Sequence, residues 1–169
     1  MGIKESDVIV FGRSMGSGVA CSIAGNENYS PLALCLMSPY KSIREVAASK
    51  AGFLANLVKE RFSNIQAVQE SIRCPSFILH GERDNVVPFE HGLGLFNALQ
   101  ERYQRENKHN KIMFVRRANM THNDFDIDED LLDPLQDFLN YQQINTQVTE
   151  STPAPVFRSI EIGNVPNRQ

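Results

Sequence analysis

The sequence lacks the features that mark a membrane-spanning, nucleic-acid-binding or secreted protein. Its 169 residues carry a net charge of −3 and no long basic run, which argues against a nucleic-acid partner. No apolar stretch approaches the length that spans a bilayer. Residues 1–7 lack the charged and then apolar pattern of a secretory signal. We therefore expect a soluble protein of the cytoplasm that does not bind nucleic acid.

Cysteine is scarce and occurs at three positions. Cys21, Cys35 and Cys74 make an odd number, lie in apolar segments and lack the spacing of metal ligands. We expect all three to be reduced residues of the core, in a reducing compartment. Nothing in the sequence points to a metal or to any other cofactor.

The rest of the chain is organised around an apolar run that ends in a Gly-x-Ser-x-Gly turn. Val8–Phe11 shows no polar alternation, which is typical of a strand buried on both faces in the middle of a parallel sheet. Gly12 and Gly16 remove Cβ atoms that would collide where the chain turns sharply from strand into helix. Such a turn presents the Ser14 hydroxyl at the carboxyl edge of the sheet.

The segment after the serine predicts a helix from Met15 to about Ala24. Its amino end points at the serine hydroxyl, where free N–H groups and the helix dipole stabilise a developing oxyanion. We expect the Met15 N–H to be one oxyanion donor. Glycine and serine are common, so the pentapeptide alone is weak evidence. Its place between a buried strand and a helix of small residues favours a catalytic serine.

Strands and helices alternate along the rest of the chain. Apolar runs predict further strands, and apolar residues at helical spacing predict the helices between and after them. The expected strands are 32–37, 76–80 and 111–116, and the expected helices are 88–107, with Phe89, Leu93, Phe96 and Leu99 buried, and 128–141. The alternation predicts an α/β fold with a parallel sheet of about four strands and helices on both faces. Ligands of such a sheet bind beyond the carboxyl ends of its strands.

Residues 43–72 form a long segment between two strands, with helical spacing interrupted by Gly52. Its position fits a cap over a substrate cleft, in which apolar residues such as Leu54 and Leu57 would line an acyl pocket. An ordinary pair of packing helices fits nearly as well.

The composition changes near the end of the chain. From residue 145 onward Thr, Ser, Pro, Glu and Asn dominate, with too few apolar residues to offset the entropy of ordering. We therefore expect a folded domain over residues 1–144 and a flexible tail over residues 145–169.

A serine hydroxyl is a poor nucleophile at neutral pH, so acyl transfer needs a base and a carboxylate that orients the base. His122 lies in a polar loop after the last strand, from which its ring can reach over the sheet edge. Asp84 follows the preceding strand. We interpret the remaining candidates as core or solvated histidines, namely His80, His91 and His109, and as loop charges, namely Glu82 and Asp124.

Three segments together resemble the α/β-hydrolase superfamily, namely 12–18, 80–88 and 121–123. The resemblance covers about residues 7–141, and within the superfamily the chain is most similar to intracellular palmitoyl-protein thioesterase-like and Bem46-like serine hydrolases. It implies cleavage of an ester or thioester, with S-acylated proteins among the candidate substrates. Ser14 would attack, His122 would move the proton and Asp84 would orient the histidine. The alternative is a catalytically inactive, hydrolase-like interaction module.

In this superfamily the nucleophile strand is the fifth of eight, and a loop after the third strand supplies a second oxyanion N–H. The resemblance therefore implies that the chain is the carboxyl-terminal half of the fold, as in a fragment. We expect the free edge of Val8–Phe11 to cause self-association and the isolated chain to hydrolyse esters poorly. Peripheral membrane association of the intact protein stays open.

Overall fold

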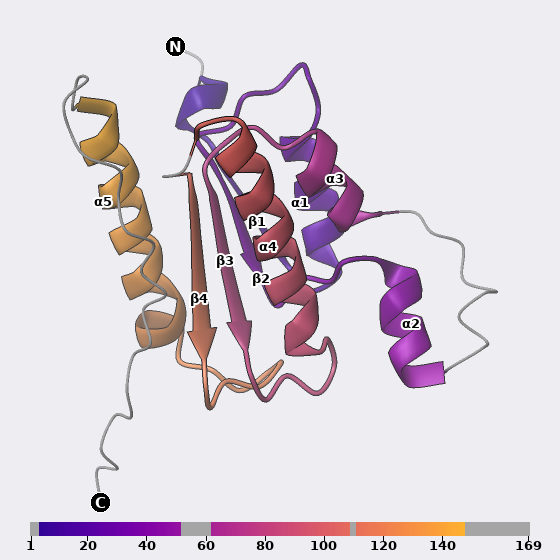
Figure 1. Ribbon diagram of the computed structural model, residues 1–169. Helices are drawn as coiled ribbons and strands as arrows, with labels where there is room; N and C mark the ends of the chain where they lie inside the picture. The colour runs from indigo at the N-terminus through magenta and orange to yellow at the C-terminus, as the bar shows by residue number, and fades with distance from the viewer. Residues whose placement is uncertain (1–3, 52–61, 109–110, 148–169) are drawn as a thin grey trace, which may run out of the picture.

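The computed structural model describes residues 4–51, 62–108 and 111–147, and its centre is one parallel sheet of four strands in the order β1-β2-β3-β4 (Figure 1). The strands are β1 (Ile9–Arg13), β2 (Ala33–Met37), β3 (Ser76–Gly81) and β4 (Ile112–Arg117). The helical elements are η1 (Glu5–Asp7), α1 (Gly16–Ala24), α2 (Ile43–Ala51), α3 (Asn64–Glu70), α4 (Phe89–Arg105), a π-helical turn η3 (Ile127–Leu132) and α5 (Asp133–Gln147). The predicted α/β architecture is confirmed.

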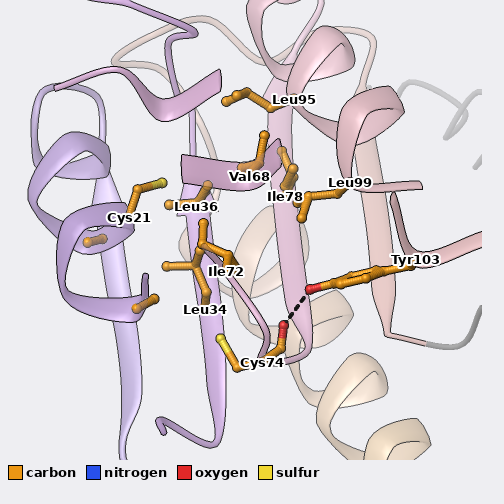
Figure 2. Close-up of a cluster of buried hydrophobic side chains, with 12 residues drawn as sticks. Cys21, Leu34, Leu36, Val68, Ile72, Cys74, Ile78, Leu95, Leu99 and Tyr103 are labelled. Carbon is orange, nitrogen blue, oxygen red and sulfur yellow. Dashed lines mark hydrogen bonds between the residues drawn. The ribbon is translucent and has the colours of Figure 1, made fainter. Parts of the chain in front are cut away.

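Helices α1, α3 and α4 cover one face of the sheet (Figures 1 and 2). Leu34 and Leu36 of β2 and Ile78 of β3 point into this layer, and all three are fully buried. At one end of the cluster the Tyr103 hydroxyl donates a hydrogen bond of 2.7 Å to the Cys74 carbonyl. This bond satisfies a phenol that would otherwise be costly to bury.

Helix α5 covers the other face. Because side chains alternate along a strand, Cys35 and Met37 of β2 point to this side. Phe77 of β3 packs against Phe138 of α5, with ring centroids 5.7 Å apart. The two layers confirm the prediction of helices on both faces.

The three cysteines are free and buried, as predicted. Burial raises the pKa of Cys21 and of Cys35 to about 12 and that of Cys74 to about 11. All three therefore stay protonated at neutral pH and act as core residues.

Strand β1 lies at the edge of this sheet, so its interpretation as a strand buried on both faces is wrong for this chain. It pairs with β2 alone among the described strands. Val8, which precedes β1, is 41% exposed. Phe11 lies on the same face as Ile9 and is 48% exposed, because α5 packs over strands farther along the sheet. The expected free strand edge is therefore present.

The buried stripe of α4 differs from the expected one. Leu99 is buried as predicted, but Leu93 is 36% exposed and Leu95 is fully buried in its place. The cause is the close packing of Gly92, where an added Cβ would lie 2.3 Å from the His80 ring. This contact turns residue 92, and not residue 93, toward the sheet. Phe96 is half-buried and stacks on Phe114 with centroids 5.2 Å apart.

Two segments lie partly outside the described residues. In 43–72, helix α3 packs into the core through Val68, which supports the packing-helix interpretation for that part. Residues 52–61, which include Leu54 and Leu57, lie outside the described residues, so the cap interpretation stays a prediction. The last helix continues to Gln147, past the expected start of the tail at residue 145. Residues 148–169 lie outside the described residues.

The two glycines of the Gly-x-Ser-x-Gly turn differ in what surrounds them. A Cβ on Gly12 would lie 2.5 Å from the Ala20 Cβ and 2.6 Å from the Gly16 carbonyl oxygen, which confirms the steric prediction for Gly12. A Cβ on Gly16 would meet no atom within 4 Å, so the same prediction is wrong there. Gly16 opens the first turn of α1, where its Cβ direction is clear of neighbours.

We expect Gly12→Ala to destabilise the domain by about 2 kcal/mol or more, because the clash involves backbone atoms that cannot move alone. Gly16→Ala is the matched control and is expected to change the unfolding free energy by less than about 0.5 kcal/mol. Urea unfolding of both variants measures the difference. Equal destabilisation by the two substitutions would contradict the proposed packing of the turn.

Candidate active site

Ser14 occupies a sharp, strained turn at the carboxyl end of β1. Its φ of 51° lies in the left-handed region, which is costly for a residue with a Cβ. The Ser14 N–H donates to the Met37 carbonyl at 3.0 Å, which continues the pairing with β2 through the turn. Helix α1 begins two residues later, at Gly16. The turn expected from the sequence is present, and a strained, partly exposed serine between a strand and a helix is characteristic of nucleophile turns.

A buried polar network supports this turn from α3. The Ser17 hydroxyl donates to the Ser14 carbonyl at 2.6 Å. Asn64, at the start of α3, donates through Nδ2 to Ser17 Oγ at 3.0 Å and to the Tyr40 carbonyl at 2.8 Å. Asn64 is 1% exposed, and these bonds satisfy the donors of its amide, whereas its Oδ1 has no described partner. Sequence reasoning missed Asn64, since a single polar residue at a helix start resembles a simple cap.

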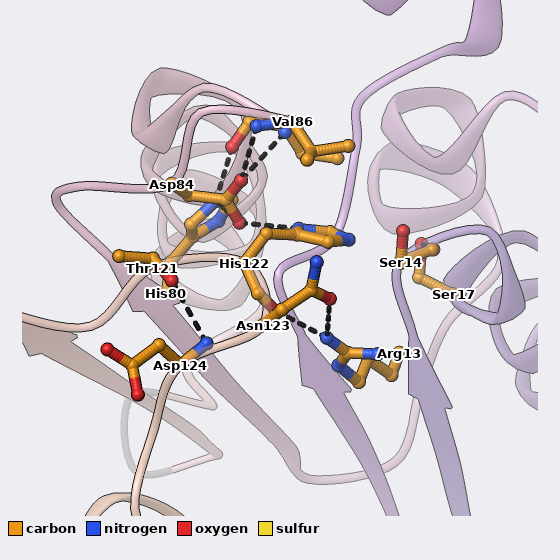
Figure 3. A network of polar contacts seen from close by, with 11 residues as sticks. Arg13, Ser14, Ser17, His80, Asp84, Val86, Thr121, His122, Asn123 and Asp124 are labelled. Atoms are coloured by element: carbon orange, nitrogen blue, oxygen red, sulfur yellow. Dashed lines mark hydrogen bonds and ion pairs between the residues drawn. The ribbon is translucent and has the colours of Figure 1, made fainter.

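Asp84 and His122 form a buried hydrogen-bonded pair at the same edge of the sheet (Figure 3). His122 Nδ1 lies 2.8 Å from Asp84 Oδ2. The other carboxylate oxygen, Oδ1, accepts from the N–H groups of Val86 at 2.9 Å and Val87 at 2.8 Å. This arrangement fixes the carboxylate and makes Nδ1 the protonated nitrogen of His122, which leaves Nε2 able to accept a proton.

In Figure 3 the His122 ring lies between Asp84 and Ser14. The structure therefore brings the three predicted site residues to one edge. Among the described residues, no hydrogen bond joins His122 to Ser14. Unliganded sites often show long catalytic contacts that shorten with substrate, so the roles of the three residues stay predictions.

Hydrogen bonds stabilise the ionised carboxylate of Asp84. Burial by itself would raise the pKa of this carboxyl, but bonds from His80, His122 and the amides of Val87 and Val86 together lower the pKa well below its usual range. Asp84 is therefore ionised at neutral pH and can stabilise a protonated His122.

The lowered pKa predicts how stability depends on pH. The folded state favours the ionised form of Asp84 more than the unfolded state does. Ionised Asp84 therefore adds to the free energy of unfolding, and this stabilisation is fully present above about pH 4, which is the pKa of the unfolded state. It is lost as the pH falls from there toward the folded pKa. We expect the unfolding free energy of the wild type to fall more steeply below pH 4 than that of Asp84→Asn. Urea titrations between pH 7 and pH 3 measure this, and parallel curves would contradict it.

His80 touches the same carboxylate from the core side. Its Nε2 lies 2.9 Å from the Val87 carbonyl and 3.5 Å from Asp84 Oδ2, and the side chain is fully buried. It is a core histidine, as the sequence suggested, but its contact with Asp84 was missed. The sequence held a signal for this contact, because His80 is the penultimate residue of β3, from which the Asp84 loop begins.

The other described candidates have partners outside this pair. His91 is buried, accepts from the Lys41 N–H at 3.2 Å, and has a pKa lowered by burial. His109 lies outside the described residues. Glu82 is paired with Arg116, and the Asp124 N–H caps the His122 loop through Thr121 Oγ1 at 3.0 Å.

Met15 stands at the amino end of α1, where the first N–H groups of a helix have no partner within the helix. Its side chain is 74% exposed, so nothing in the described structure covers this end of the helix on that side. The position fits the expected oxyanion donor, and that role stays a prediction.

Two further residues at this edge were not singled out from the sequence. Arg13, which precedes Ser14, donates through Nη2 to the His122 carbonyl and, at 3.0 Å, to Asn123 Oδ1 (Figure 3). Ser38, at the end of β2, has a φ of 47° and a buried hydroxyl. Ser14 and Ser38 thus both have a positive φ at neighbouring strand ends, which indicates that packing at this edge of the sheet holds the backbone in a strained conformation.

Comparison with known proteins agrees with the fold. The chain is 31% identical over 144 residues to alpha/beta hydrolase domain-containing protein 17B of Homo sapiens, which covers 85% of this chain and 45% of that protein. It is 27% identical over 148 residues to alpha/beta hydrolase domain-containing protein aho-3 of Caenorhabditis elegans, covering 88% of this chain and 40% of that protein. The chain thus spans less than half the length of these relatives. No family model matches it.

Among solved structures, the esterase domain of a Rhodothermus marinus protein superposes with a TM-score of 0.56 at 16% identity, covering 80% of this chain and 59% of that domain. The sheet order and these relatives together show that the chain is a homologue of α/β-hydrolase domain proteins and carries part of the α/β-hydrolase fold. Among the residues that the structure describes, no helix has the length and apolar character needed to cross a bilayer.

Proposed function

We propose that this chain carries the nucleophile, the base and the orienting acid of a serine hydrolase that cleaves an ester or a thioester. The observation that carries the proposal is the buried Asp84–His122 hydrogen bond at the sheet edge where Ser14 occupies a strained turn. Hydrolase relatives of similar sequence support it. Thioesters of S-acylated proteins are the substrate class that the resemblance favours, in the cytoplasm or at a membrane surface.

The chemistry runs through an acyl-enzyme. His122 Nε2 takes the Ser14 proton while Oγ attacks the carbonyl carbon, and the negative charge passes to the carbonyl oxygen near the Met15 N–H. Collapse of this intermediate breaks the bond to the leaving group, which receives the proton from His122. Water then attacks the acyl group by the same route, and the acid product and free Ser14 are released. Asp84 keeps Nδ1 protonated throughout.

Trapping the acyl-enzyme tests this proposal. The chain is incubated with the p-nitrophenyl ester and the thioester of the same octanoyl group, quenched in acid, and weighed by intact-protein mass spectrometry. The proposal expects one octanoyl adduct on the wild type and none on Ser14→Ala. An adduct on both proteins, or on neither under any substrate excess, would favour a hydrolase-like interaction module without turnover.

A further inference from the structure

Arg13 links two parts of the sheet edge that the strand order keeps apart. It ends β1, whereas His122 follows β4, and two strands lie between them. Its guanidinium Nη2 donates to the backbone carbonyl of His122 and to the Asn123 side chain. Its Cζ also lies 5.5 Å from the centroid of the Phe125 ring, within the range of a cation–π contact. One side chain therefore contacts three residues of the loop that carries the base.

Two other described hydrogen bonds join this loop to the segment that follows β3. The Met120 carbonyl accepts from the Arg83 N–H at 3.2 Å, and His122 Nδ1 bonds to Asp84. Gly81 packs so tightly against Met120 that an added Cβ would lie 2.1 Å from its carbonyl oxygen. These contacts set where the loop stands relative to the acid, and they do not set its distance from β1. The contacts of Arg13 do, because Arg13 is the residue next to Ser14.

We propose that Arg13 is a positioning residue, which holds the His122 loop against the end of β1 and so fixes the separation between the His122 ring and Ser14. The catalytic consequence rests on the proposed function, because a base must stand within hydrogen-bond reach of the hydroxyl that it deprotonates. A displacement of about 1 Å at such a contact costs about a hundredfold in rate. Arginine suits this role, since its planar guanidinium offers several donors in a fixed geometry, which a lysine cannot reproduce.

Hydrogen exchange and NMR test the positioning without any need for turnover. Arg13→Met keeps the apolar stem and removes the donors. We expect amide exchange of the loop 121–125 to rise by about tenfold or more, and the nuclear Overhauser contacts between the His122 ring and Ser14 to weaken. Amides of 84–87, on the Asp84 side, are expected to stay as in the wild type. Arg13→Lys keeps one charged donor, so its amide exchange in the loop 121–125 should lie between that of the wild type and that of Arg13→Met.

Arg116→Met is the matched control. Arg116 lies at the same edge with its guanidinium over the Phe89 ring and paired to Glu82, and it makes no described contact with His122. Its removal is expected to leave exchange of the loop 121–125 unchanged. Unchanged loop exchange in Arg13→Met, or an equal rise in both variants, would overturn the proposal.

Labelling of Ser14 by a fluorophosphonate adds the chemical readout. We expect the labelling rate of Arg13→Met to fall by about tenfold or more, whereas Arg116→Met keeps the wild-type rate. A wild-type labelling rate in Arg13→Met would overturn the positioning role while leaving the proposed function intact. A wild type that does not react would instead contradict the proposed function, and in that case the exchange and NMR contacts still decide the role of Arg13.

Discussion

Replacement of Ser14 or His122 by alanine is expected to lower ester hydrolysis by at least about a thousandfold in a protein that contains this segment. Members of a nucleophile, base and acid set act as a unit, so removing one member removes nearly all of their joint effect. The proposed function treats Ser14, His122 and Asp84 as such a set, on the basis of the hydrogen bond between His122 and Asp84 and the strained turn at Ser14. Asp84→Asn is expected to cost a similar factor, because the amide no longer holds His122 in the required tautomer.

Steady-state kinetics with an activated ester measure these losses. Ser22→Ala is a suitable control, since Ser22 is an exposed serine on α1 away from the turn. The control should keep the wild-type rate, and thermal unfolding of each variant shows that a loss of rate is not a loss of fold. A His122→Ala protein with near wild-type turnover would contradict the assignment of the base.

The second large effect concerns the free edge of the sheet, for which we propose self-association of the chain. The Val8 carbonyl and the Ser14 N–H bond toward β2, so the alternating residues between them, Ile9, Phe11 and Arg13, direct their backbone N–H and C=O groups away from the sheet. Phe11 is 48% exposed beside this row of groups. An apolar strand edge of this kind pairs with other chains unless a charge or a proline interrupts it.

We expect light scattering of the 169-residue chain to show a mass above that of a monomer, growing with protein concentration. Phe11→Lys places a charge at the edge and should shift the population toward monomer. Leu132→Lys is the matched control, because Leu132 is 49% exposed in η3, far along the chain from β1, and its replacement should leave association unchanged. A monodisperse wild-type monomer at high concentration would show that this edge does not recruit a second chain.

The sequence predicted the elements of the fold because each carries a local signal. A uniformly apolar run such as Leu34–Met37 buries all its side chains only in a sheet that is covered on both faces. In the structure β2 is buried along its whole length. The place of β1 in the sheet was not predictable from its composition, which favoured a central strand, and its free edge was expected only from the resemblance to a longer fold. A strand is central or at an edge according to how many strands lie beside it, and the composition of the strand itself does not determine that number.

In the site, too, some features were predictable from the sequence and others depend on packing between elements. The positions of Ser14, Asp84 and His122 after the ends of β1, β3 and β4 were enough to predict that they lie at one edge of the sheet, because parallel strands bring their carboxyl ends to the same edge. The contacts of Arg13 and Asn64 could not be predicted, because each depends on how far one loop or helix lies from the turn at Ser14. Such distances come from packing between elements, as does the difference between Gly12 and Gly16.

The most direct test of the account is to locate the residue that reacts with a fluorophosphonate. The chain is labelled at neutral pH, digested, and mapped by tandem mass spectrometry, with Asp84→Asn and His122→Ala treated in parallel. The account predicts a single adduct on Ser14, formed at a rate that falls by about a hundredfold or more in both variants. An adduct on another residue, or labelling of Ser14 that proceeds equally fast without His122, would contradict it.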